Sequence, residues 1–456
     1  MANGTLPSYL QSAAPNPPEN RAPWYKNTAP SYAGIFLSVP FMAGMAGALQ
    51  FGSVWAGVVG LILGALFCFL LYYVPGMLGM RTGMPLYVVG SSTFGTHGAM
   101  VIPNILMGIL QIGWHAVFTF SAATFFMAAI GSTAGPNTVG FWVFCIIWGF
   151  LLALVGAIGI GLLAGLSSWL PILPLVMIII AGFANMGGLA GFKPAVELPT
   201  GFLMIPMLGL GCFAALQAAA GFFATAGAAG ADFAMNNRNK KDVVLGGLFG
   251  ITIAALVAGF FALLAIAGAM GKNPDIAASF GTPQFFAACI GEVGGVIKTV
   301  MFWVFVIACI CPTGFCAFLA ANAFSTMFPK LPRIPLTLVA GVIGIILAAT
   351  GVAQNLIAFF LIIGASFGPI IGAMTADYLR SGGWAGPRAG VNWAGYIAWA
   401  AGFIVGILGV IPGIGFGYGL ETLMSFIVGF AVYLILAELG LEPRVVELPG
   451  AAKERA

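Results

Sequence analysis

Long runs of apolar residues, separated by short groups rich in Gly, Pro or charge, make up most of the chain. A helix needs about 20 such residues to cross a bilayer. Twelve runs of about this length predict twelve spans, near 32–52, 54–78, 98–128, 139–164, 166–187, 204–230, 243–270, 294–322, 334–350, 354–376, 391–412 and 418–438. The pattern therefore predicts an all-α polytopic membrane protein.

Two of these spans carry residues that interrupt helices. The first contains Gly34 and Pro40, and Pro40 removes one backbone hydrogen bond and frees a carbonyl about one turn earlier. The sixth contains Gly221 and Gly227 at corresponding positions. Transporters built from inverted repeats bind their substrates at broken helices near the midplane of the bilayer, so both spans are predicted to be broken there. The alternative is that the glycines are helix-packing contacts and Pro40 a simple kink.

Composition confines the chain to the membrane. Hydrophobic residues make up 61% and charged residues 6% of the sequence, and the mean hydropathy is +1.07. A soluble protein carries about 25% charged residues, so a water-facing surface over the whole chain is excluded. The seven cysteines are interpreted as packing residues, because they are odd in number and nearly all lie in apolar runs.

The basic residues predict the orientation. With the N-terminus inside, thirteen of the 16 Lys and Arg residues fall on the cytoplasmic side, and Lys193, Lys272 and Lys298 fall at outer ends. The positive-inside rule then favours twelve spans with both termini cytoplasmic, in the inner (plasma) membrane. The first 31 residues are polar and proline-rich without an apolar signal segment, so they are predicted to be a cytoplasmic tail.

The acidic residues fall at or beyond the ends of the predicted spans. Because intramembrane acids are the usual proton relays, a proton pump based on carboxylates is not expected. Neither a pair of acids nor a metal cluster suggests an enzyme, and no nucleic-acid partner is expected.

A weak internal symmetry divides the chain. About twenty residues that do not span separate the second and third spans (79–97), and about the same number separate the seventh and eighth (271–293). The first interval lies inside and the second outside, as in inverted repeats. The predicted division is a cytoplasmic tail (1–31), a first repeat of spans one to five (32–190), a second repeat of spans six to ten (191–378), two further spans (379–439) and a cytoplasmic C-terminal tail (440–456).

The third span carries a polar and aromatic stripe. Gln111, Trp114 and His115 lie three and four residues apart, so they share a helix face. A planar heterocycle would suit this face, because Trp114 offers a stacking surface and the Gln111 amide offers both a donor and an acceptor. The alternative is that Gln111 joins two helices and His115 is a packed histidine of the bundle.

Several short motifs resemble those of bacterial cytosine permeases, members of the nucleobase:cation symporter-1 family. They occur in order from about residue 32 to 400, and they are Arg81-Thr-Gly83, Phe94-Gly-Thr-His-Gly98, the run from Pro103 to Trp114, Gly221-Phe-Phe-Ala-Thr-Ala-Gly227, Ala231-Asp-Phe233, Arg238-Asn239, Ala376-Asp-Tyr378 and Val391-Asn-Trp393. The resemblance implies a LeuT-type fold with five plus five helices in inverted repeats and two C-terminal helices.

The resemblance also implies roles for individual residues. Gln111 would hydrogen-bond a heterocycle, Trp114 and Phe223 would stack on its two faces, and Thr225 would add a hydroxyl where cytosine permeases carry serine. The sodium site of the family would use carbonyls of Gly34 and Leu37 and a hydroxyl of the eighth span, here Thr313.

The eighth span departs from the family pattern. Cytosine permeases have a pair of threonines there and an asparagine one turn earlier, whereas this chain has Thr313 alone and no asparagine in that turn. The predicted sodium site of this chain therefore lacks part of the set of ligands that the family pattern implies. His115 replaces an apolar aromatic residue of those permeases, and since histidine titrates near neutral pH, we hypothesise that it contacts the ligand or couples protons.

These features predict a secondary active transporter. It would import a nucleobase such as cytosine, or a related planar heterocycle, by alternating access coupled to Na⁺ or H⁺, without another cofactor. Two alternatives stay open: the same fold carrying a hydantoin, allantoin or thiamine-precursor pyrimidine, and a non-transporting membrane receptor or a channel.

Overall fold

A computed structural model describes residues 6–194, 207–280, 282–411 and 419–448. In these residues ten helices are long and apolar enough to cross a membrane, and a bent pair at the start adds an eleventh. The twelfth is the apolar helix α18 (Arg333–Ala349), whose 17 residues lie at the short end of the range for a spanning helix. Each predicted span therefore corresponds to a helix, although residues 204–206, 412 and 418 of the predicted spans lie outside the described residues.

The first half of the chain begins with α1 (Ser8–Gln11) and ends at the fifth span. The helices that follow α1 are α2 (Thr28–Phe36), α3 (Val39–Gly44), α4 (Ala46–Gln50), α5 (Val54–Thr82), α6 (Leu86–Phe94), α7 (Leu106–Ala129), α8 (Val139–Ile158), α9 (Ile160–Ser167) and α10 (Ile172–Asn185). The predicted fourth span was too long, because the helix ends at Ile158 and the chain turns at Gly159 into α9.

The second half has the same alternation of long and short helices. These are α11 (Met207–Ala228), α12 (Gly230–Ala234), α13 (Lys240–Gly247), α14 (Ala254–Lys272), α15 (Pro283–Gly291), α16 (Gly295–Ala308), α17 (Ile310–Met327), α18, α19 (Leu356–Arg380), α20 (Trp393–Ile407) and α21 (Glu421–Glu438). Short irregular turns of helix complete the inventory: Pro18–Asn20, Trp24–Lys26, Met100–Ile105, Met186–Gly191, Leu248–Ile253, Pro274–Ser279, Val352–Gln354 and Leu408–Val410.

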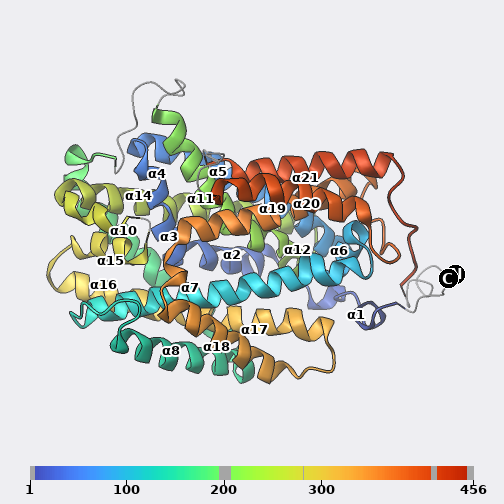
Figure 1. The fold of residues 1–456 in the computed structure, drawn as a ribbon, viewed down its shortest axis with the longest axis horizontal. Coiled ribbons are helices and arrows are strands. Elements are labelled where there is room, and N and C mark those ends of the chain that lie inside the picture. The colour runs from blue at the N-terminus through green and yellow to red at the C-terminus, as the bar shows by residue number, and fades with distance from the viewer. Residues whose placement is uncertain (1–5, 195–206, 281, 412–418, 449–456) are drawn as a thin grey trace.

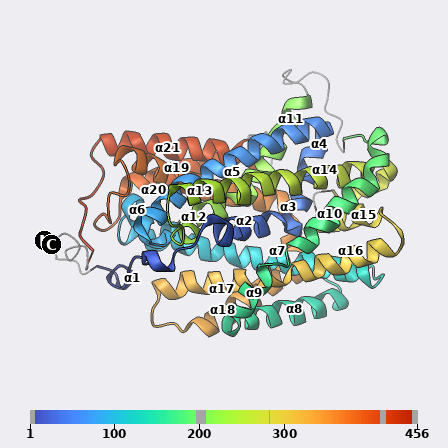
Figure 2. The same cartoon turned by 180° about the vertical axis from the view of Figure 1, so that it is seen from behind.

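The two non-spanning intervals each contain a short helix, and these helices lie at opposite ends of the bundle. Helix α6 lies between the second and third spans and α15 between the seventh and eighth. Figures 1 and 2 both place α6 at the end that carries α1 and place α15 at the far end. This is the arrangement that inverted repeats require, and it agrees with the LeuT-type architecture predicted from the sequence.

Glycines let the helices pack backbone against backbone. A Cβ atom on Gly60 of α5 would lie 2.0 Å from the carbonyl oxygen of Cys212 in α11, and one on Gly79 would lie 2.1 Å from that of Ala231 in α12. Such approaches are possible only without a side chain, and lipid supplies no hydrophobic drive for helices to associate. Close contact therefore joins α5 firmly to α11 and α12.

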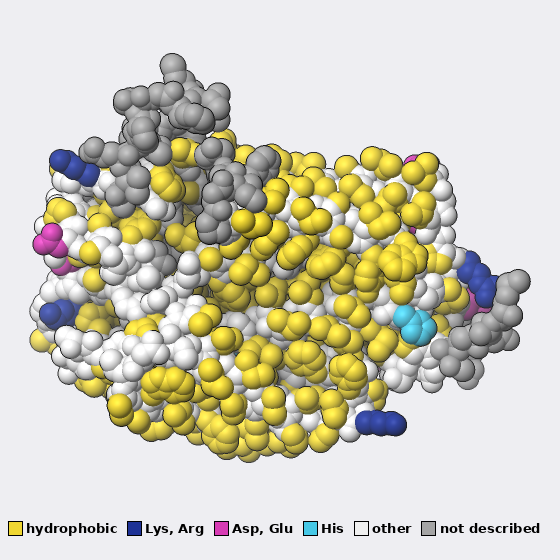
Figure 3. Space-filling view, viewed as in Figure 1, with side chains coloured by type: hydrophobic (Ala, Val, Ile, Leu, Met, Phe, Trp, Pro, Cys, Tyr) yellow, Lys and Arg dark blue, Asp and Glu magenta, His cyan; other side chains and the backbone are white. Residues whose placement is uncertain are grey.

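Apolar side chains cover the middle of the molecule on the face that Figure 3 draws. On the face drawn in Figure 3, hydrophobic side chains cover the centre, whereas Lys, Arg, Asp and Glu appear at the two ends of the long axis. Helix α1 and the C-terminal end of α21 lie at the same end, on the right of Figure 1. We call this end the α1 end.

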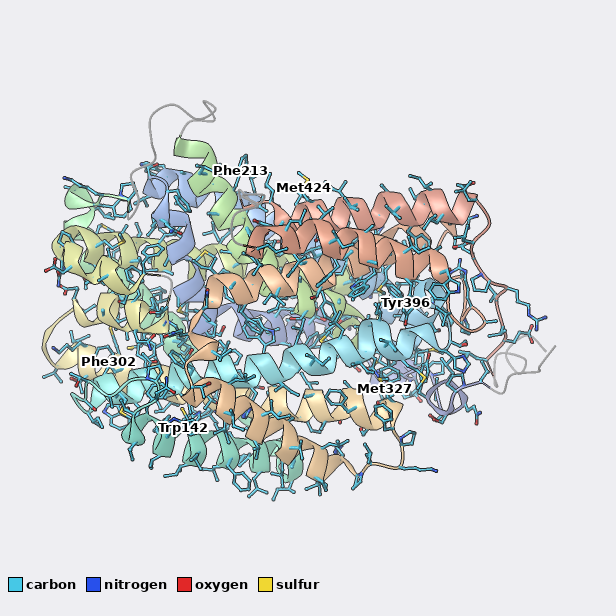
Figure 4. All side chains as sticks on the ribbon, viewed as in Figure 1. Trp142, Phe213, Phe302, Met327, Tyr396 and Met424 are labelled. Carbon is cyan, nitrogen blue, oxygen red and sulfur yellow. The ribbon has the colours of Figure 1, made fainter. Side chains whose placement is uncertain are left out.

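At the α1 end, a buried ionic network joins α6 to the last three helices. Arg388, in the loop between α19 and α20, forms ion pairs with Asp377 at 2.9 Å and with Glu442 at 2.8 Å. Asp377 in turn accepts a hydrogen bond from Ser92 of α6 at 2.6 Å. Tyr396 of α20, labelled in Figure 4, donates to the carbonyl of Gly98 just after α6 at 2.9 Å. The Tyr433 hydroxyl of α21 donates to Glu442 at 2.7 Å, so these bonds hold α6, α19, α20 and α21 together.

Candidate functional site

The first span is broken where the sequence predicted. Helix α2 ends at Phe36 and α3 begins at Val39, and the two parts of the span are bent by 51°. Pro40 lacks an N–H, so the Phe36 carbonyl loses the donor that a continuous helix would supply. The backbone of Ser38, between the half-helices, is extended. The break exposes backbone carbonyls at the C-terminal end of α2, which carries negative dipole charge.

Ser38 is a polar residue that the sequence reasoning missed. Its side chain is buried, and its hydroxyl has no hydrogen-bond partner in the described part of the protein. An unpaired buried hydroxyl costs free energy, so this atom is ready to bond a ligand. The signal was present in the sequence, because Ser38 is the polar residue between Gly34 and Pro40.

The sixth span does not break where it was predicted to. Helix α11 runs without interruption through Gly221 and Gly227 to Ala228, and the chain turns only at Ala229 before the short α12. Glycine keeps its N–H and so leaves the helical hydrogen bonds intact, whereas proline removes one. The glycines here serve packing instead: a Cβ on Gly221 would lie 2.5 Å from the carbonyl oxygen of Phe360.

Trp114 of α7 lies in a cluster of aromatic rings. Its ring centre is 5.2 Å from that of Phe222 in α11, 5.1 Å from Phe359 and 6.0 Å from Phe360 in α19. Its indole N–H donates to the hydroxyl of Thr225 at 3.4 Å. The structure thus brings together two predicted site residues, Trp114 and Thr225, from helices more than 100 residues apart in sequence.

Phe223 lies on a different side of α11 from Phe222. Its ring stacks on that of Phe36 at 5.2 Å and 18°, and it is 5.4 Å from the ring of Tyr32. Successive residues of a helix point about 100° apart, so neighbouring phenylalanines face different partners. Phe222 therefore faces Trp114 in this structure, and Phe223 packs against α2.

The Gln111 amide has little to bond within the protein. The side chain is half-buried, and its nitrogen contacts the sulfur of Met107, one turn earlier in α7, at 3.6 Å. A thioether is a weak acceptor, so the amide keeps its hydrogen-bonding capacity. This is the property that a residue reading the polar edge of a heterocycle needs.

His115 lies away from the aromatic cluster, between α7, α17 and α18. Its Nδ1 is 2.8 Å from the Thr313 carbonyl, and because a carbonyl only accepts, Nδ1 carries the proton. The other nitrogen, Nε2, is buried without a partner among the described residues. A Cβ on Gly344 of α18 would lie 2.4 Å from the imidazole ring. This placement favours the packing interpretation of His115 over a contact with the ligand.

The residues predicted to bind sodium are not gathered by hydrogen bonds in the described residues. The Thr313 hydroxyl donates to the Cys309 carbonyl of its own helix at 2.6 Å. Gly34 lies against Pro171, where a Cβ would be 3.2 Å from the proline ring. Leu37 stands at the C-terminal end of α2. A sodium site made of Gly34, Leu37 and Thr313 stays a prediction; the Thr313 hydroxyl keeps its oxygen lone pairs while it donates to Cys309.

Asp232 of α12 is an acidic residue that follows the end of the sixth span. It accepts a hydrogen bond from the backbone N–H of Leu86, the first residue of α6, at 3.4 Å. Burial raises the pKa of Asp232 to about 7, and the bond from Leu86 opposes this rise. The carboxyl group is therefore able to gain or lose a proton near neutral pH.

Comparison with protein families identifies one match that covers nearly the whole chain. The family described as permease for cytosine/purines, uracil, thiamine, allantoin matches residues 15–432. Cytosine permease of Escherichia coli K12 is 26% identical over 364 residues, which is 74% of this chain and 75% of the relative. A putative allantoin permease of the same organism is 24% identical over 349 residues, or 72% of this chain and 70% of the relative.

Solved structures with the same fold are also found. Mhp1, described as a nucleobase-cation-symport-1 family transporter in a closed conformation with bromovinylhydantoin bound, has a TM-score of 0.65 at 17% identity, covering 100% of this chain and 98% of Mhp1. A Na⁺-coupled sialic acid symporter has a TM-score of 0.65 at 15% identity, covering 94% and 92% of the two chains. At these identities the likeness establishes the fold.

Proposed function

The chain belongs to the family of permeases for cytosine/purines, uracil, thiamine and allantoin, and from this premise we propose that it imports a nucleobase such as cytosine by alternating access. Alternating access places the substrate near the midplane, beside broken helices. The observation that carries the proposal is the Trp114 cluster, in which aromatic rings of α7, α11 and α19 meet. Gln111 lies one turn before Trp114 in α7, and its amide makes only a weak contact with the sulfur of Met107.

The chemistry of this cluster suits a flat, polar ring. Aromatic side chains stack on the faces of a nucleobase, and each stacked ring is worth about 1–3 kcal/mol. The Gln111 amide and the Thr225 hydroxyl offer donors and acceptors for the ring edge, and the Ser38 hydroxyl lacks a partner in the described residues. In this structure Trp114 and Phe222 touch each other, so a ligand would enter only when these rings separate.

We further propose that Na⁺ is the coupling ion. The broken end of α2 offers the backbone carbonyls and the negative helix dipole that unwound helices use to hold Na⁺ in inverted-repeat transporters. Proton coupling is the competing proposal, and Asp232 is the group that would serve it near neutral pH.

A second candidate substrate class has support of its own. The chain is similar to a putative allantoin permease, and its fold is that of a transporter with a hydantoin derivative bound. These compounds share the flat ring and the alternating N–H and C=O groups of a pyrimidine, so the same residues would serve them.

A thermal-shift screen tests the proposal. Purified protein is heated with cytosine, uracil, purines, allantoin and hydantoins, each with and without Na⁺. A ligand that binds the folded state raises the melting temperature by mass action, and a rise that requires Na⁺ would support sodium coupling. Trp114→Ala should abolish the shift by the best ligand. Stabilisation by amino acids or sugars and by none of the heterocycles would overturn the proposal.

A further inference from the structure

The imidazole of His115 lies between α7, α17 and α18, which pack side by side (Figures 1 and 2). The side chain is completely buried. Helix α18 meets the ring at two glycines about one turn apart: a Cβ on Gly344 would lie 2.4 Å from the imidazole carbon Cδ2, and one on Gly341 would lie 3.9 Å from Nε2. Gly344 therefore leaves the space that the ring occupies, and a methyl group at this position would displace the ring.

A hydrogen bond adds to this packing. Nδ1 of His115 donates to the Thr313 carbonyl of α17 at 2.8 Å. Among the described side chains of α7, two form hydrogen bonds to other helices, and the second is Trp114, which donates to Thr225 of α11 at 3.4 Å. The two bonds come from adjacent residues and join α7 to different helices.

Three consecutive residues of α7 thus face different neighbours. A Cβ on Gly113 would lie 2.7 Å from the Phe359 ring of α19, Trp114 faces Phe222 of α11, and His115 faces α17 and α18. Successive residues of a helix point about 100° apart, so the rotation that seats His115 also fixes the direction of Trp114. Side chains reach about 5–6 Å from the helix axis, so turning α7 by about 20° would move the indole by about 2 Å.

We propose that His115 is a positioning residue for substrate recognition, which holds α7 at the rotation that turns Trp114 toward Thr225 and Phe222. This inference rests on the proposed transport function, because it concerns the site where Trp114 would stack on a heterocycle. The effect is indirect, since His115 acts through the helix that it shares with Trp114. A backbone carbonyl accepts the bond, so the side chain of Thr313 takes no part in it.

Three substitutions of His115 separate the hydrogen bond from the bulk of the ring. His115→Phe keeps a ring but removes the donor, His115→Asn keeps an N–H near the place of Nδ1, and His115→Ala removes both. Isothermal titration with cytosine measures the affinity of each folded variant. His115→Phe should lower affinity about fivefold and His115→Asn less than about threefold, because a typical hydrogen bond contributes a factor of about this size. His115→Ala should lower it most.

A second pair of variants leaves His115 unchanged. Gly344→Ala places a methyl group 2.4 Å from the imidazole, so it should displace the ring and weaken cytosine binding as His115→Ala does. Gly341→Ala in the same helix is the matched control, because its methyl group would meet that of Ala153 in α8 at 2.5 Å but stay 3.9 Å from Nε2. It should lower the melting temperature without lowering affinity.

Fluorine NMR reports the position of Trp114 without requiring a ligand. In protein labelled with fluorotryptophan, the Trp114 resonance is the one that disappears in Trp114→Phe. This resonance should shift in His115→Ala, His115→Phe and Gly344→Ala, and it should stay in place in Gly341→Ala. If His115→Ala does not fold, the other two variants provide both measurements.

Two results would overturn the inference: an unmoved Trp114 resonance in His115→Phe and Gly344→Ala, or cytosine affinities in these variants equal to that of the unaltered protein. Failure of the unaltered protein to bind cytosine would instead count against the proposed function. The Trp114 resonance would then decide by itself whether His115 positions Trp114.

Discussion

At the scale of single residues, the site depends on which face of a helix each aromatic ring occupies. Phe222 and Phe223 are adjacent in α11, yet one ring faces Trp114 and the other stacks on Phe36. The two rings therefore have different contacts: Phe222 faces Trp114, and Phe223 packs between α11 and α2. Substitution of each in turn separates these roles.

Phe222→Ala should weaken binding of the best heterocycle by about 5- to 160-fold, because one stacking ring is worth about 1–3 kcal/mol. Phe223→Ala should change affinity less and instead lower stability by about 3–5 kcal/mol, the usual cost of truncating a buried phenylalanine. Isothermal titration measures the first effect and thermal unfolding the second. If Phe223→Ala weakened binding more than Phe222→Ala did, Phe223 would be the ring that stacks on the ligand.

Asp232 leads to a prediction about pH. Its pKa is raised from 3.8 to about 7 in the folded protein, so between these values the unfolded chain loses the proton while the folded protein keeps it. Stability should therefore fall as pH rises from about 4 to about 7 and then level off.

Asp232→Asn should remove this dependence. The melting temperature of the variant, minus that of the unaltered protein, should be larger at pH 8 than at pH 5. Asp275→Asn, at an exposed aspartate, is the control. Its melting temperature should differ from that of the unaltered protein by the same small amount at pH 5 and at pH 8. A difference for Asp232→Asn that does not change with pH would contradict the prediction.

At the scale of helices, proline and glycine have different effects on the two equivalent spans. Pro40 breaks the first span because it has no N–H, and the chain is extended at Ser38. The glycines of the sixth span leave α11 continuous through 221–227. Their lack of a side chain is used for close packing, as it is between α5 and α11.

The packing of α5 on α11 can be tested at one glycine. Gly60→Ala would place a methyl group 2.0 Å from the Cys212 carbonyl oxygen, so the helices must move apart. Overpacking of this kind typically costs about 1–3 kcal/mol, which denaturant titration or thermal unfolding would detect. Gly161→Ala in α9 has open space around the new methyl group and should be neutral or slightly stabilising. Equal effects of the two substitutions would contradict the prediction.

At the scale of the whole molecule, apolar side chains cover the middle of the face drawn in Figure 3, and charged side chains lie toward its two ends. Helix α1 and the C-terminal end of α21 lie at the same end, as an even number of crossings requires. Which side of the membrane this end faces follows from the distribution of Lys and Arg, since basic residues near spans stay in the cytoplasm.

Fusion proteins check this orientation. A fluorescent protein joined to the C-terminus should fluoresce, and alkaline phosphatase at the same point should be inactive, because both would lie in the cytoplasm. Phosphatase inserted in the connection 271–293 should be active. The opposite pattern would reverse the predicted topology.

The sequence alone determined the membrane class, the approximate positions of the twelve spans and the two non-spanning intervals at opposite ends; the short helices α6 and α15 within these intervals came from the structure. Hydrophobic runs and their interruptions are local properties, and the bilayer imposes one length on every span. Pro40 likewise predicted its break correctly, because the loss of an N–H is a property of one residue. The resemblance implied that Trp114 and Thr225 both contact the substrate, and the structure brings these two side chains together.

Only the tertiary structure decided which faces the helices turn to one another. Helix rotation comes from packing against several neighbours at once, and no local pattern records it. For this reason the structure turns Phe222 toward Trp114, moves His115 to the α17–α18 side, and leaves the sixth span unbroken at its glycines. For the same reason the packing of the N-terminal segment was unexpected. Its polar, proline-rich sequence resembles a free tail, but Tyr9 bonds the Thr96 carbonyl after α6, and Asn16 bonds Gly83 at the end of α5 and Asn236 after α12.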